Sequence, residues 1–413
     1  MTLREQALLA KEASYKLSLA GISQKNDALL KIADYLLTNT DYILAENEKD
    51  IANAEENGVR ATMIDRLRLT KERICDMAEG VRQVAALKDP VGEVINMTER
   101  PNGLVIGKKR VPLGLVGIIY EARPNVTVDA VCLTLKTGNA TLLRGGKEAL
   151  CSNLALTKVM KEAIVSAGLP ESTVELLSDT SRETAKEMMK LNGIVDVLIP
   201  RGGAGLIRTV VENATVPVIE TGTGNCHTYV DDSAALDMAL SILVNAKTQR
   251  PSVCNACESL LVSEKIADKF LPMAKKALEE KGVELRGCEK TLQIISVNSA
   301  TDEDFYTEYN DLILSVKIVS GIDEAITHIN THNTKHSECI VTGSYENSQK
   351  FLKSVDAAAV YVNASTRFTD GFEFGYGAEI GISTQKLHAR GPMGLEALTT
   401  VKYIIYGNGQ IRG

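Results

Sequence analysis

The sequence predicts an α/β protein built on parallel sheets and preceded by a helical segment. Short apolar runs rich in β-branched residues, beginning at residues 115–119, alternate with helix-length segments of mixed polarity. Such runs are typical of buried strands, and their alternation with helices requires crossover connections and therefore a parallel sheet. The segment before Pro90 contains no proline and is rich in good helix formers, which predicts helices.

The helical segment shows a clear amphipathic pattern. Leu29, Ile32, Ala33, Leu36 and Leu37 have the i, i+3, i+4, i+7 and i+8 spacing that places side chains on one face of a helix. We therefore expect these helices to pack against another element through that face.

The alternating region divides into two parts. In the first part we expect strands at 115–119, 140–143, 174–177, 195–199 and 216–219, and helices at 147–168, 181–191 and 205–212. After residue 231 we expect helices at 237–248, 265–281 and 323–330, and strands at 258–262, 294–297, 316–319, 339–342 and 359–362. Residues 104–111 predict a hairpin-like excursion, and residues 400–406 alternate like an exposed edge strand, which needs a partner.

Composition and charge restrict the classes of function. The 413 residues suffice for two or three domains, and the net charge of −7 argues against nucleic-acid or membrane-surface partners, which need a clustered basic field. The longest apolar stretches reach about seven residues, whereas roughly 20 are needed to span a bilayer. No export signal is visible, because Glu5 lies where an apolar core would begin. The eight scattered cysteines are typical of reduced thiols, so we expect a cytoplasmic protein.

Cys254 is the candidate nucleophile. Pro251 and Ser252 end the helix expected before it, so Cys254 lies at a helix-to-strand junction where its side chain can face a cleft. For a single cysteine the usual alternative is a buried, inert thiol. Cys257 forms a Cys-X-X-Cys pair with Cys254, which is weak evidence for zinc and leaves a regulatory disulfide as a hypothesis.

Two other residues suit catalysis near strand ends. Glu220 follows the strand expected at 216–219 and leads into a two-glycine loop, and sites form at strand ends in open α/β sheets. Asn125 follows Arg123 and Pro124, which favour an extended turn, and its amide donors suit a developing oxyanion. The alternatives are a solvated acid for Glu220 and a helix cap for Asn125.

Glycines and cations predict a phosphate site. Arg144 and Lys147 follow the strand expected at 140–143, and Arg201, Gly202 and Gly203 precede the helix expected at 205–212. Glycines before a helix N-terminus let a phosphate approach backbone N–H groups. The GxGxxG fingerprint is absent, so this signal is weak by itself.

In this order, these strings resemble the aldehyde dehydrogenase superfamily. The match is carried by YEARPNVT (120–127), LRGGKE (143–148), IPRGG (199–203), ETGTGN (220–225), RPSVCNA (250–256), HNTKHSE (332–338), VNASTRF (362–368) and FGYGAEIGIST (374–384). The resemblance covers nearly the whole chain. It implies an aldehyde dehydrogenase-like fold with a Rossmann-like NADP-binding domain (1–98 and 113–226), an α/β catalytic domain (227–394) and a β-flap for oligomerisation (99–112 and 395–413).

The resemblance also implies an activity, the NADPH-dependent reduction of L-glutamyl 5-phosphate to L-glutamate 5-semialdehyde in proline biosynthesis. Cys254 would form the thioester, and Asn125 with the backbone N–H of Cys254 would hold the oxyanion. Glu220 matches the family glutamate with an open role, because a reductase needs no base to activate water. The resemblance assigns the cofactor to Arg144, Lys147, Arg201, Gly202, Gly203, Gly222 and Glu308. It assigns the anionic groups of the substrate to Arg123, Arg250 and Arg367.

The resemblance implies partners as well, and the sequence leaves alternatives. A homo-oligomer and a functional link to glutamate 5-kinase are implied, and two cations near the adenosine ribose favour NADPH over NADH. The competing functions are a family member that hydrolyses its thioester or transfers it to coenzyme A, and a catalytically silent scaffold. No metal site is expected, because the residues between His328 and His336 predict a helix end followed by a loop.

Overall fold

The computed structural model describes residues 1–412 and confirms the α/β prediction. Contacts divide the chain into unit 1 (Met1–Glu220, Gly375–Gly381 and Met393–Gly413) and unit 2 (Thr221–Phe374 and Ile382–Pro392). The division differs from the predicted domains, because unit 1 ends at Glu220 instead of residue 226 and includes residues 375–381. Residue 413, the last of the predicted flap, lies outside the described residues.

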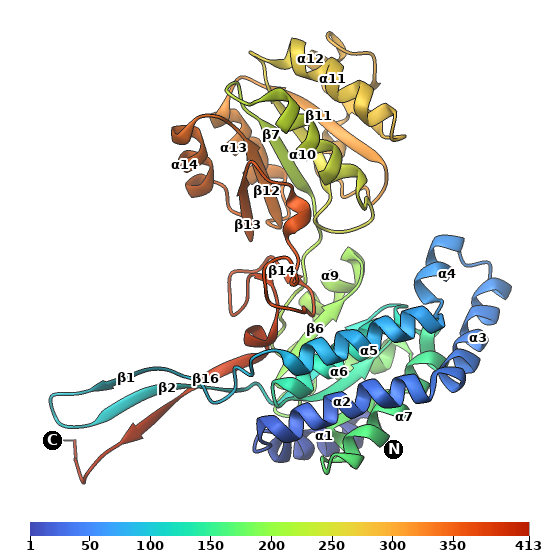
Figure 1. Cartoon of the computed structure of the whole chain (residues 1–413), viewed down its shortest axis with the longest axis vertical. Helices are drawn as coiled ribbons and strands as arrows, with labels where there is room; N and C mark the ends of the chain where they lie inside the picture. Colours follow the sequence, from blue (N-terminus) through green and yellow to red (C-terminus); the bar gives the residue numbers. More distant parts are fainter. Residues whose placement is uncertain (413) are drawn as a thin grey trace. The chain divides into compact units, whose positions relative to one another are not determined.

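Unit 1 begins with the predicted helices. They are α1 (Leu3–Leu17), α2 (Ile22–Thr38), α3 (Thr40–Glu56), α4 (Ala61–Leu67) and α5 (Lys71–Ala86) (Figure 1). On α2, the predicted apolar face is fully buried at Leu29, Ile32, Ala33 and Leu36. Because α2 packs against α5 and α7 (Leu150–Ser166), this face forms part of the core of unit 1.

The sheet of unit 1 is parallel throughout, with strand order β5-β4-β3-β6. Its strands are β3 (Leu115–Tyr120), β4 (Ala140–Arg144), β5 (Val174–Leu176) and β6 (Val197–Arg201), connected through α6 (Pro124–Lys136), α7 and α8 (Arg182–Met188) and followed by α9 (Ala204–Asn213). The chain places β4 and β5 on one side of β3 and β6 on the other. The strand order therefore reverses between β3 and β6, and ligands bind at the carboxyl ends of strands at such a point.

The prediction of a strand at 216–219 is wrong. The structure has only an isolated bridge between Leu198 and Val218, with backbone bonds from Leu198 N to Pro217 O (2.8 Å) and from Ile219 N to Leu198 O (2.9 Å). Pro217 has no N–H to donate, so the ladder does not continue.

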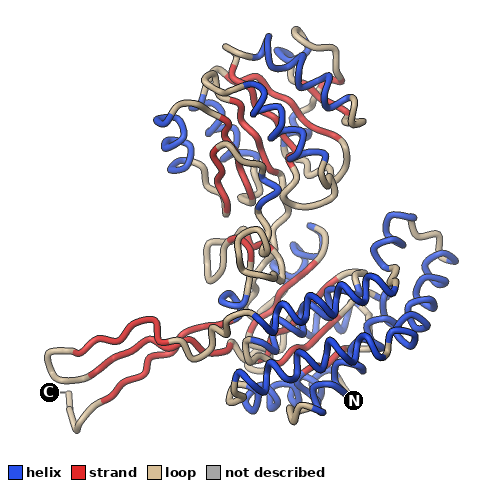
Figure 2. The backbone as a smooth tube through the Cα atoms, viewed as in Figure 1, coloured by secondary structure: helices blue, strands red, loops and turns tan. Residues whose placement is uncertain are grey.

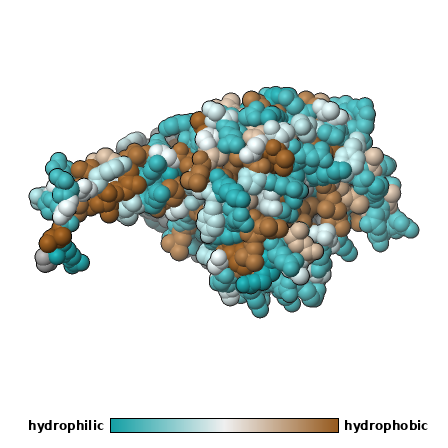
Figure 3. All heavy atoms as spheres, turned by 90° about the horizontal axis from the view of Figure 1, so that it is seen from below, coloured by the Kyte–Doolittle hydropathy of each residue, from teal (hydrophilic) through white to brown (hydrophobic). Residues whose placement is uncertain are grey.

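A three-stranded antiparallel flap belongs to unit 1. It consists of β1 (Val94–Glu99), β2 (Val105–Pro112) and β16 (Thr399–Tyr406), with β2 in the centre (Figures 1 and 2). The predicted edge strand therefore finds its partner within the chain, and β1 begins at Val94 rather than within the predicted flap range. Apolar side chains gather on the flap surface, where Ile95 and Tyr403 are 49% and 62% exposed (Figure 3).

Unit 2 contains a parallel seven-stranded sheet in the order β10-β9-β11-β8-β7-β12-β13. Its strands are β7 (Cys226–Val230), β8 (Cys257–Ser263), β9 (Glu284–Gly287), β10 (Asn298–Ser299), β11 (Ile313–Val319), β12 (Ser337–Val341) and β13 (Ala359–Val362). One apolar core contains α10 (Leu236–Thr248) and α11 (Ala267–Glu279), and a second contains α13 (Ile322–His332) and α14 (Tyr345–Ser354). The sheet is thus covered on both faces, as the prediction of a parallel sheet requires.

The prediction of a strand at 294–297 is also wrong. A short helix, α12 (Glu289–Leu292), ends just before it, and the N–H groups of Ile294 and Ile295 both bond to Thr291 O, at 3.0 and 2.9 Å. These apolar residues therefore form a turn, and the strand β10 starts only at Asn298. Among residues 1–412, no helix combines the length and hydropathy needed to cross a membrane.

Candidate active site

Cys254 lies in a tight turn between α10 and β8, as the sequence predicts. Ala256 N donates to Val253 O at 3.0 Å, so Cys254 and Asn255 are the two central residues of the turn. The Cys254 side chain is half-buried, whereas Cys257 is fully buried at the start of β8. Cys254 and Cys257 are not joined by a disulfide in the structure.

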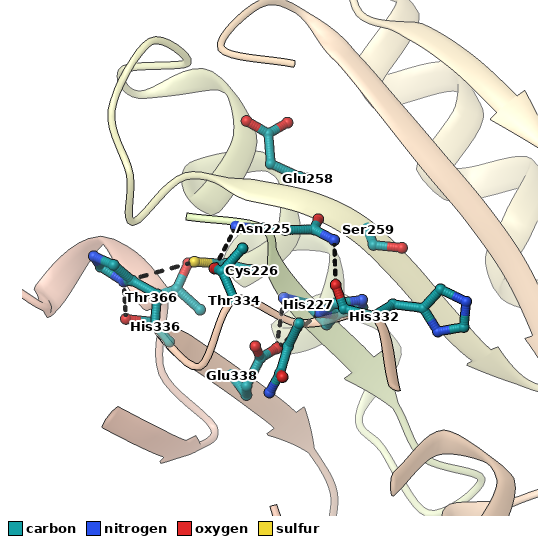
Figure 4. Close-up of polar contacts among 12 residues, drawn as sticks. Asn225, Cys226, His227, Glu258, Ser259, His332, Thr334, His336, Glu338 and Thr366 are labelled. Atoms are coloured by element: carbon teal, nitrogen blue, oxygen red, sulfur yellow. Dashed lines mark hydrogen bonds and ion pairs between the residues drawn. The ribbon is translucent and has the colours of Figure 1, made fainter. Parts of the chain in front are cut away.

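The loop before β7 packs directly on the main chain of Cys254. A Cβ atom on Gly224 would lie 1.4 Å from Cys254 O, so only glycine allows this approach. The buried Cys226 thiol donates to the same carbonyl oxygen at 3.2 Å, and its sulfur lies 3.9 Å from His336 Nδ1 (Figure 4). These contacts fix the peptide bond that follows the candidate nucleophile.

Two further contacts fix the loop before β7, one made by its own residue Gly222 and one made by Glu308. Gly222 N donates to Ile382 O at 2.7 Å, and a Cβ atom on Gly222 would meet Thr384 Cγ2 at 2.1 Å. Glu308 Oε1 accepts the N–H of Gly224 at 2.8 Å. Both residues, predicted as cofactor ligands, thus help to shape the loop that contacts Cys254.

Two predicted substrate residues, Arg250 and Arg367, belong to the surroundings of Cys254. Arg367 Nε donates to Gln249 Oε1 at 2.8 Å, and its Nη1 donates to Asn255 Oδ1. Burial and the charge of Arg250 lower the pKa of the Arg367 guanidinium, whereas Cys254 acts in the opposite direction. Two neighbouring cations beside a thiol suit an anionic substrate.

A buried ion pair and a buried hydrogen-bonded His–Glu pair lie in the same unit. Lys247 Nζ and Glu258 Oε2 are 2.5 Å apart and both side chains are fully buried, and burial raises the pKa of Glu258 although Lys247 opposes the shift. His227 Nδ1 and its backbone N–H both approach Glu338 Oε2, at 3.0 and 2.8 Å (Figure 4). As predicted, α13 ends at His332 and a loop leads to His336. Among the described residues, no three His, Cys, Asp or Glu side chains are placed to hold a metal ion.

Asn125 lies in unit 1, at the second helical position of α6. Arg123 is the N-cap, in an extended conformation (φ −141°, ψ 95°), and Pro124 follows at the first helical position. The helix-cap alternative for Asn125 is therefore wrong. The Asn125 side chain is exposed, and Nδ2 donates to Asp129 Oδ2 at 3.3 Å.

The N-terminus of α9 accepts an anion in the structure. Glu121, in the loop after β3, places Oε2 3.0 Å from Gly203 N, and a Cβ atom on Gly202 would lie 2.6 Å from the Glu121 carboxyl carbon. Arg201 ends β6 beside this loop. A carboxylate oxygen thus accepts a backbone N–H at this helix N-terminus, which is the kind of donor that also binds phosphate oxygens.

The two cations after β4 have different surroundings. Arg144 Nη2 donates to the carbonyls of Thr180 and Ser181, the latter at 3.0 Å, and therefore holds the loop before α8. Lys147 is exposed at the start of the 3₁₀ turn Lys147–Ala149. Glu220 is half-buried and is the last residue of the first segment of unit 1.

Sequence reasoning missed three residues of the site. Asn255 is the second central residue of the Cys254 turn, Cys226 bonds to the Cys254 carbonyl, and Glu121 bonds to the N-terminus of α9. Asn255 and Glu121 lie inside the matched strings RPSVCNA and YEARPNVT, which was the available signal. Their roles depend on contacts that no local pattern encodes.

Comparisons with known proteins agree with this geometry. A family model described as "Aldehyde dehydrogenase family" matches residues 5–311. Gamma-glutamyl phosphate reductase from Clostridium perfringens (strain 13 / Type A) is 65% identical over 404 residues, covering 98% of this chain and 97% of that protein. The protein of that name from Caldicellulosiruptor bescii is 63% identical over 413 residues, covering 99% of each. The crystal structure of gamma-glutamyl phosphate reductase from Thermotoga maritima matches with a TM-score of 0.98 at 52% identity, covering 100% of both chains.

Proposed function

Because this chain belongs to the aldehyde dehydrogenase family, we infer that it reduces L-glutamyl 5-phosphate to L-glutamate 5-semialdehyde and phosphate with NADPH. The observation that carries this function is the 65% identity over 98% of the chain to a gamma-glutamyl phosphate reductase. The turn that presents a half-buried Cys254 between fixed loops supports the same reaction. The activity belongs to proline biosynthesis.

In the proposed mechanism, Cys254 is the nucleophile. Its thiolate attacks the γ-carbonyl carbon, the carbon–oxygen bond to phosphate breaks, and phosphate leaves with the electron pair, which gives a thioester. When bound by the residues named below, NADPH would supply the hydride that reduces this thioester. The carbon–sulfur bond then breaks, so that the semialdehyde leaves and the Cys254 thiolate is regenerated.

Other residues stabilise charge in this scheme. Asn125 and the backbone N–H of Cys254 are the proposed oxyanion donors, and losing one such donor typically costs roughly a hundred- to thousandfold in rate. Arg250 and Arg367 are the proposed partners of the phosphate, and Arg123 is left for the α-carboxylate. Glu220 has no required step, because no water has to be activated.

The cofactor is assigned to the loops of unit 1 and the loop before β7. Arg201, Gly202 and Gly203 would hold the diphosphate at the N-terminus of α9, where the Glu121 carboxylate stands in for it. Lys147 is the proposed partner of the 2′-phosphate, while Arg144 shapes the neighbouring loop through Thr180 and Ser181. Gly222 and Glu308 would face the nicotinamide half.

The cellular setting is part of the proposal. The exposed apolar side chains of the flap, such as Ile95 and Tyr403, support an oligomer formed by copies of this chain. None of the eight cysteines, all within the described residues, forms a disulfide, which supports a reducing, cytoplasmic compartment. A functional link to glutamate 5-kinase follows from the lability of the acyl phosphate.

The test is the reverse reaction. Purified protein, NADP⁺ and glutamate 5-semialdehyde should give NADPH only when inorganic phosphate is present. NADPH formation without phosphate would indicate a hydrolytic enzyme, and formation that requires coenzyme A would indicate an acyl transferase. The absence of turnover with any of these acceptors would favour a scaffold.

A further inference from the structure

Asn255 is a buried polar side chain next to the proposed nucleophile. It is 5% exposed, so its carboxamide needs hydrogen-bond partners inside the protein. Nδ2 donates to the backbone oxygens of Thr369 (2.9 Å) and Arg367 (3.3 Å), and Oδ1 accepts from Arg367. Both ends of the carboxamide are thus engaged by one short segment.

This segment is a firm anchor for the Cys254 turn. Thr366 Oγ1 donates to the Asn255 carbonyl at 2.7 Å, from a fully buried position. The Thr369 hydroxyl is bonded in turn to Ser337 Oγ and to Tyr361 OH, both at 2.7 Å. Ser337 belongs to β12 and Tyr361 to β13, so the segment that holds Asn255 is itself bonded to the sheet. Asn255 therefore links the Cys254 turn to two strands of the sheet.

The same carboxamide orients the Arg367 guanidinium. Nη1 donates to Asn255 Oδ1 and Nε donates to Gln249 Oε1, so two edges of the planar group are fixed. Among the described residues, no acceptor is bonded to Nη2. Burial first, and then the charge of Arg250, lower the pKa of Arg367, and a bound anion would offset both effects.

We propose that Asn255 is a positioning residue, which fixes the Cys254 turn and directs the Arg367 guanidinium at the phosphate of the substrate. The inference rests on the proposed function, in which phosphate is the leaving group of the forward reaction. A single buried side chain then sets the distance between the attacking sulfur and the cation that receives the departing phosphate. Errors of about 1 Å in such a distance cost roughly a hundredfold in rate.

The experiment is a double-mutant cycle of Asn255→Ala and Arg367→Ala with two readouts. The first is the KM for inorganic phosphate in the reverse reaction, and the second is the rate at which iodoacetamide alkylates Cys254. Asn255→Ala should raise the phosphate KM about tenfold and slow alkylation about fivefold, because both groups lose their support. In the Arg367→Ala background, Asn255→Ala should raise the phosphate KM no further, yet still slow alkylation.

The matched control is Asn330→Ala in the same unit. Asn330 also bridges two backbone groups, donating to Ser354 O and accepting from Asp356 N, both at 2.9 Å, but it is exposed. Its loss should lower the thermal midpoint and leave both readouts unchanged. Equal effects of Asn330→Ala and Asn255→Ala, or fully additive effects on the phosphate KM in the cycle, would overturn the proposal.

A second variant keeps the proposal testable if Asn255→Ala does not fold. Thr366→Val preserves the shape of a buried side chain and removes only the hydroxyl that donates to the Asn255 carbonyl. It should slow alkylation about threefold, and an unchanged rate would contradict the anchoring role. Alkylation of Cys254 needs no substrate, so it tests the turn even if the wild-type protein shows no phosphate-dependent turnover. Such a lack of turnover would contradict the proposed function and not the anchoring role of Asn255.

Discussion

The two parallel sheets place their candidate residues at opposite ends of the strands. In unit 1, Glu121 and Gly202 follow β3 and β6, and Arg144 is the last residue of β4, so all three lie at the carboxyl ends. In unit 2, Gly224, Cys254 and Glu308 precede β7, β8 and β11, at the amino ends. The strand-end rule therefore agrees with the proposed phosphate site of unit 1 but does not locate the thiol of unit 2.

The difference has a physical basis in the loops themselves. Carboxyl-end loops lead into helix N-termini, whose free N–H groups bind anions, as Gly203 N binds the Glu121 carboxylate. The amino-end loops before β7 and β8 do not run into a helix N-terminus, so they lack its row of aligned N–H groups. Unit 2 instead fixes the Cys254 turn through side chains, namely those of Cys226 and Asn255. We therefore expect changes at the α9 loop of unit 1 to affect cofactor binding and changes at the Cys254 turn of unit 2 to affect the chemistry.

The largest effect should come from Cys254 itself. Cys254→Ala removes the proposed nucleophile and should lower kcat by about a thousandfold or more, whereas Glu220→Gln should cost at most about tenfold. Cys288→Ser, at another half-buried thiol of unit 2, is the control and should keep its activity. Initial rates of phosphate-dependent NADP⁺ reduction provide the comparison. Equal losses for the Cys254 and Glu220 variants would mean that the glutamate takes part in the chemistry.

Gly224→Ala should have the second-largest effect. The new Cβ atom would overlap Cys254 O, so the loop or the turn has to move, and kcat should fall by about a hundredfold. Gly321→Ala in the same unit is matched, because no atom lies within 4 Å of its added Cβ. If Gly224→Ala retained kcat and raised only the KM for NADPH, the assignment of this loop to the chemistry would be wrong.

The sequence was sufficient for elements with strong local patterns. The buried runs that form β3, β4 and β6, and the alternating run that forms β16, were all predicted. The strand predicted at 216–219 does not form because Pro217 interrupts the hydrogen-bond ladder. The strand predicted at 294–297 does not form because the N–H groups of Ile294 and Ile295 bond back to Thr291 O. Cys254 was found from its junction and motif. The contacts that hold it were not, because the partner of Asn255, Thr366, lies 111 residues away in the sequence.

A change in the phosphate loop of unit 1 should give a smaller and different effect. Gly202→Ala brings a Cβ atom within 2.6 Å of the Glu121 carboxyl carbon and narrows the space at α9. The KM for NADPH should rise about tenfold, equivalent to about 1.4 kcal/mol, with little change in the alkylation rate of Cys254. Gly205→Ala, in the first turn of the same helix, has open space around the added atom and serves as the control. Slower alkylation in Gly202→Ala would contradict the separation of roles between the α9 loop and the Cys254 turn.

The smallest effect is a pH dependence of the free energy of unfolding. It should appear only in unit 2, which holds all five histidines. His328 is 4% exposed, its Nδ1 lies 3.2 Å from Lys317 Nζ, and burial with nearby cations lowers its pKa from 6.5 to about 2. Because the folded-state pKa is lowered, only the unfolded state takes up a proton at His328 as the pH falls below 6.5. The free energy of unfolding is therefore highest above pH 6.5 and falls by about 1.4 kcal/mol per pH unit below it. Between pH 7.5 and 5.5, the wild type should therefore lose about 1 kcal/mol more unfolding free energy than His328→Gln, measured by urea denaturation. The exposed His388→Gln is the control and should follow the wild type; hydrogen exchange that increased first in unit 1 at low pH would contradict the assignment.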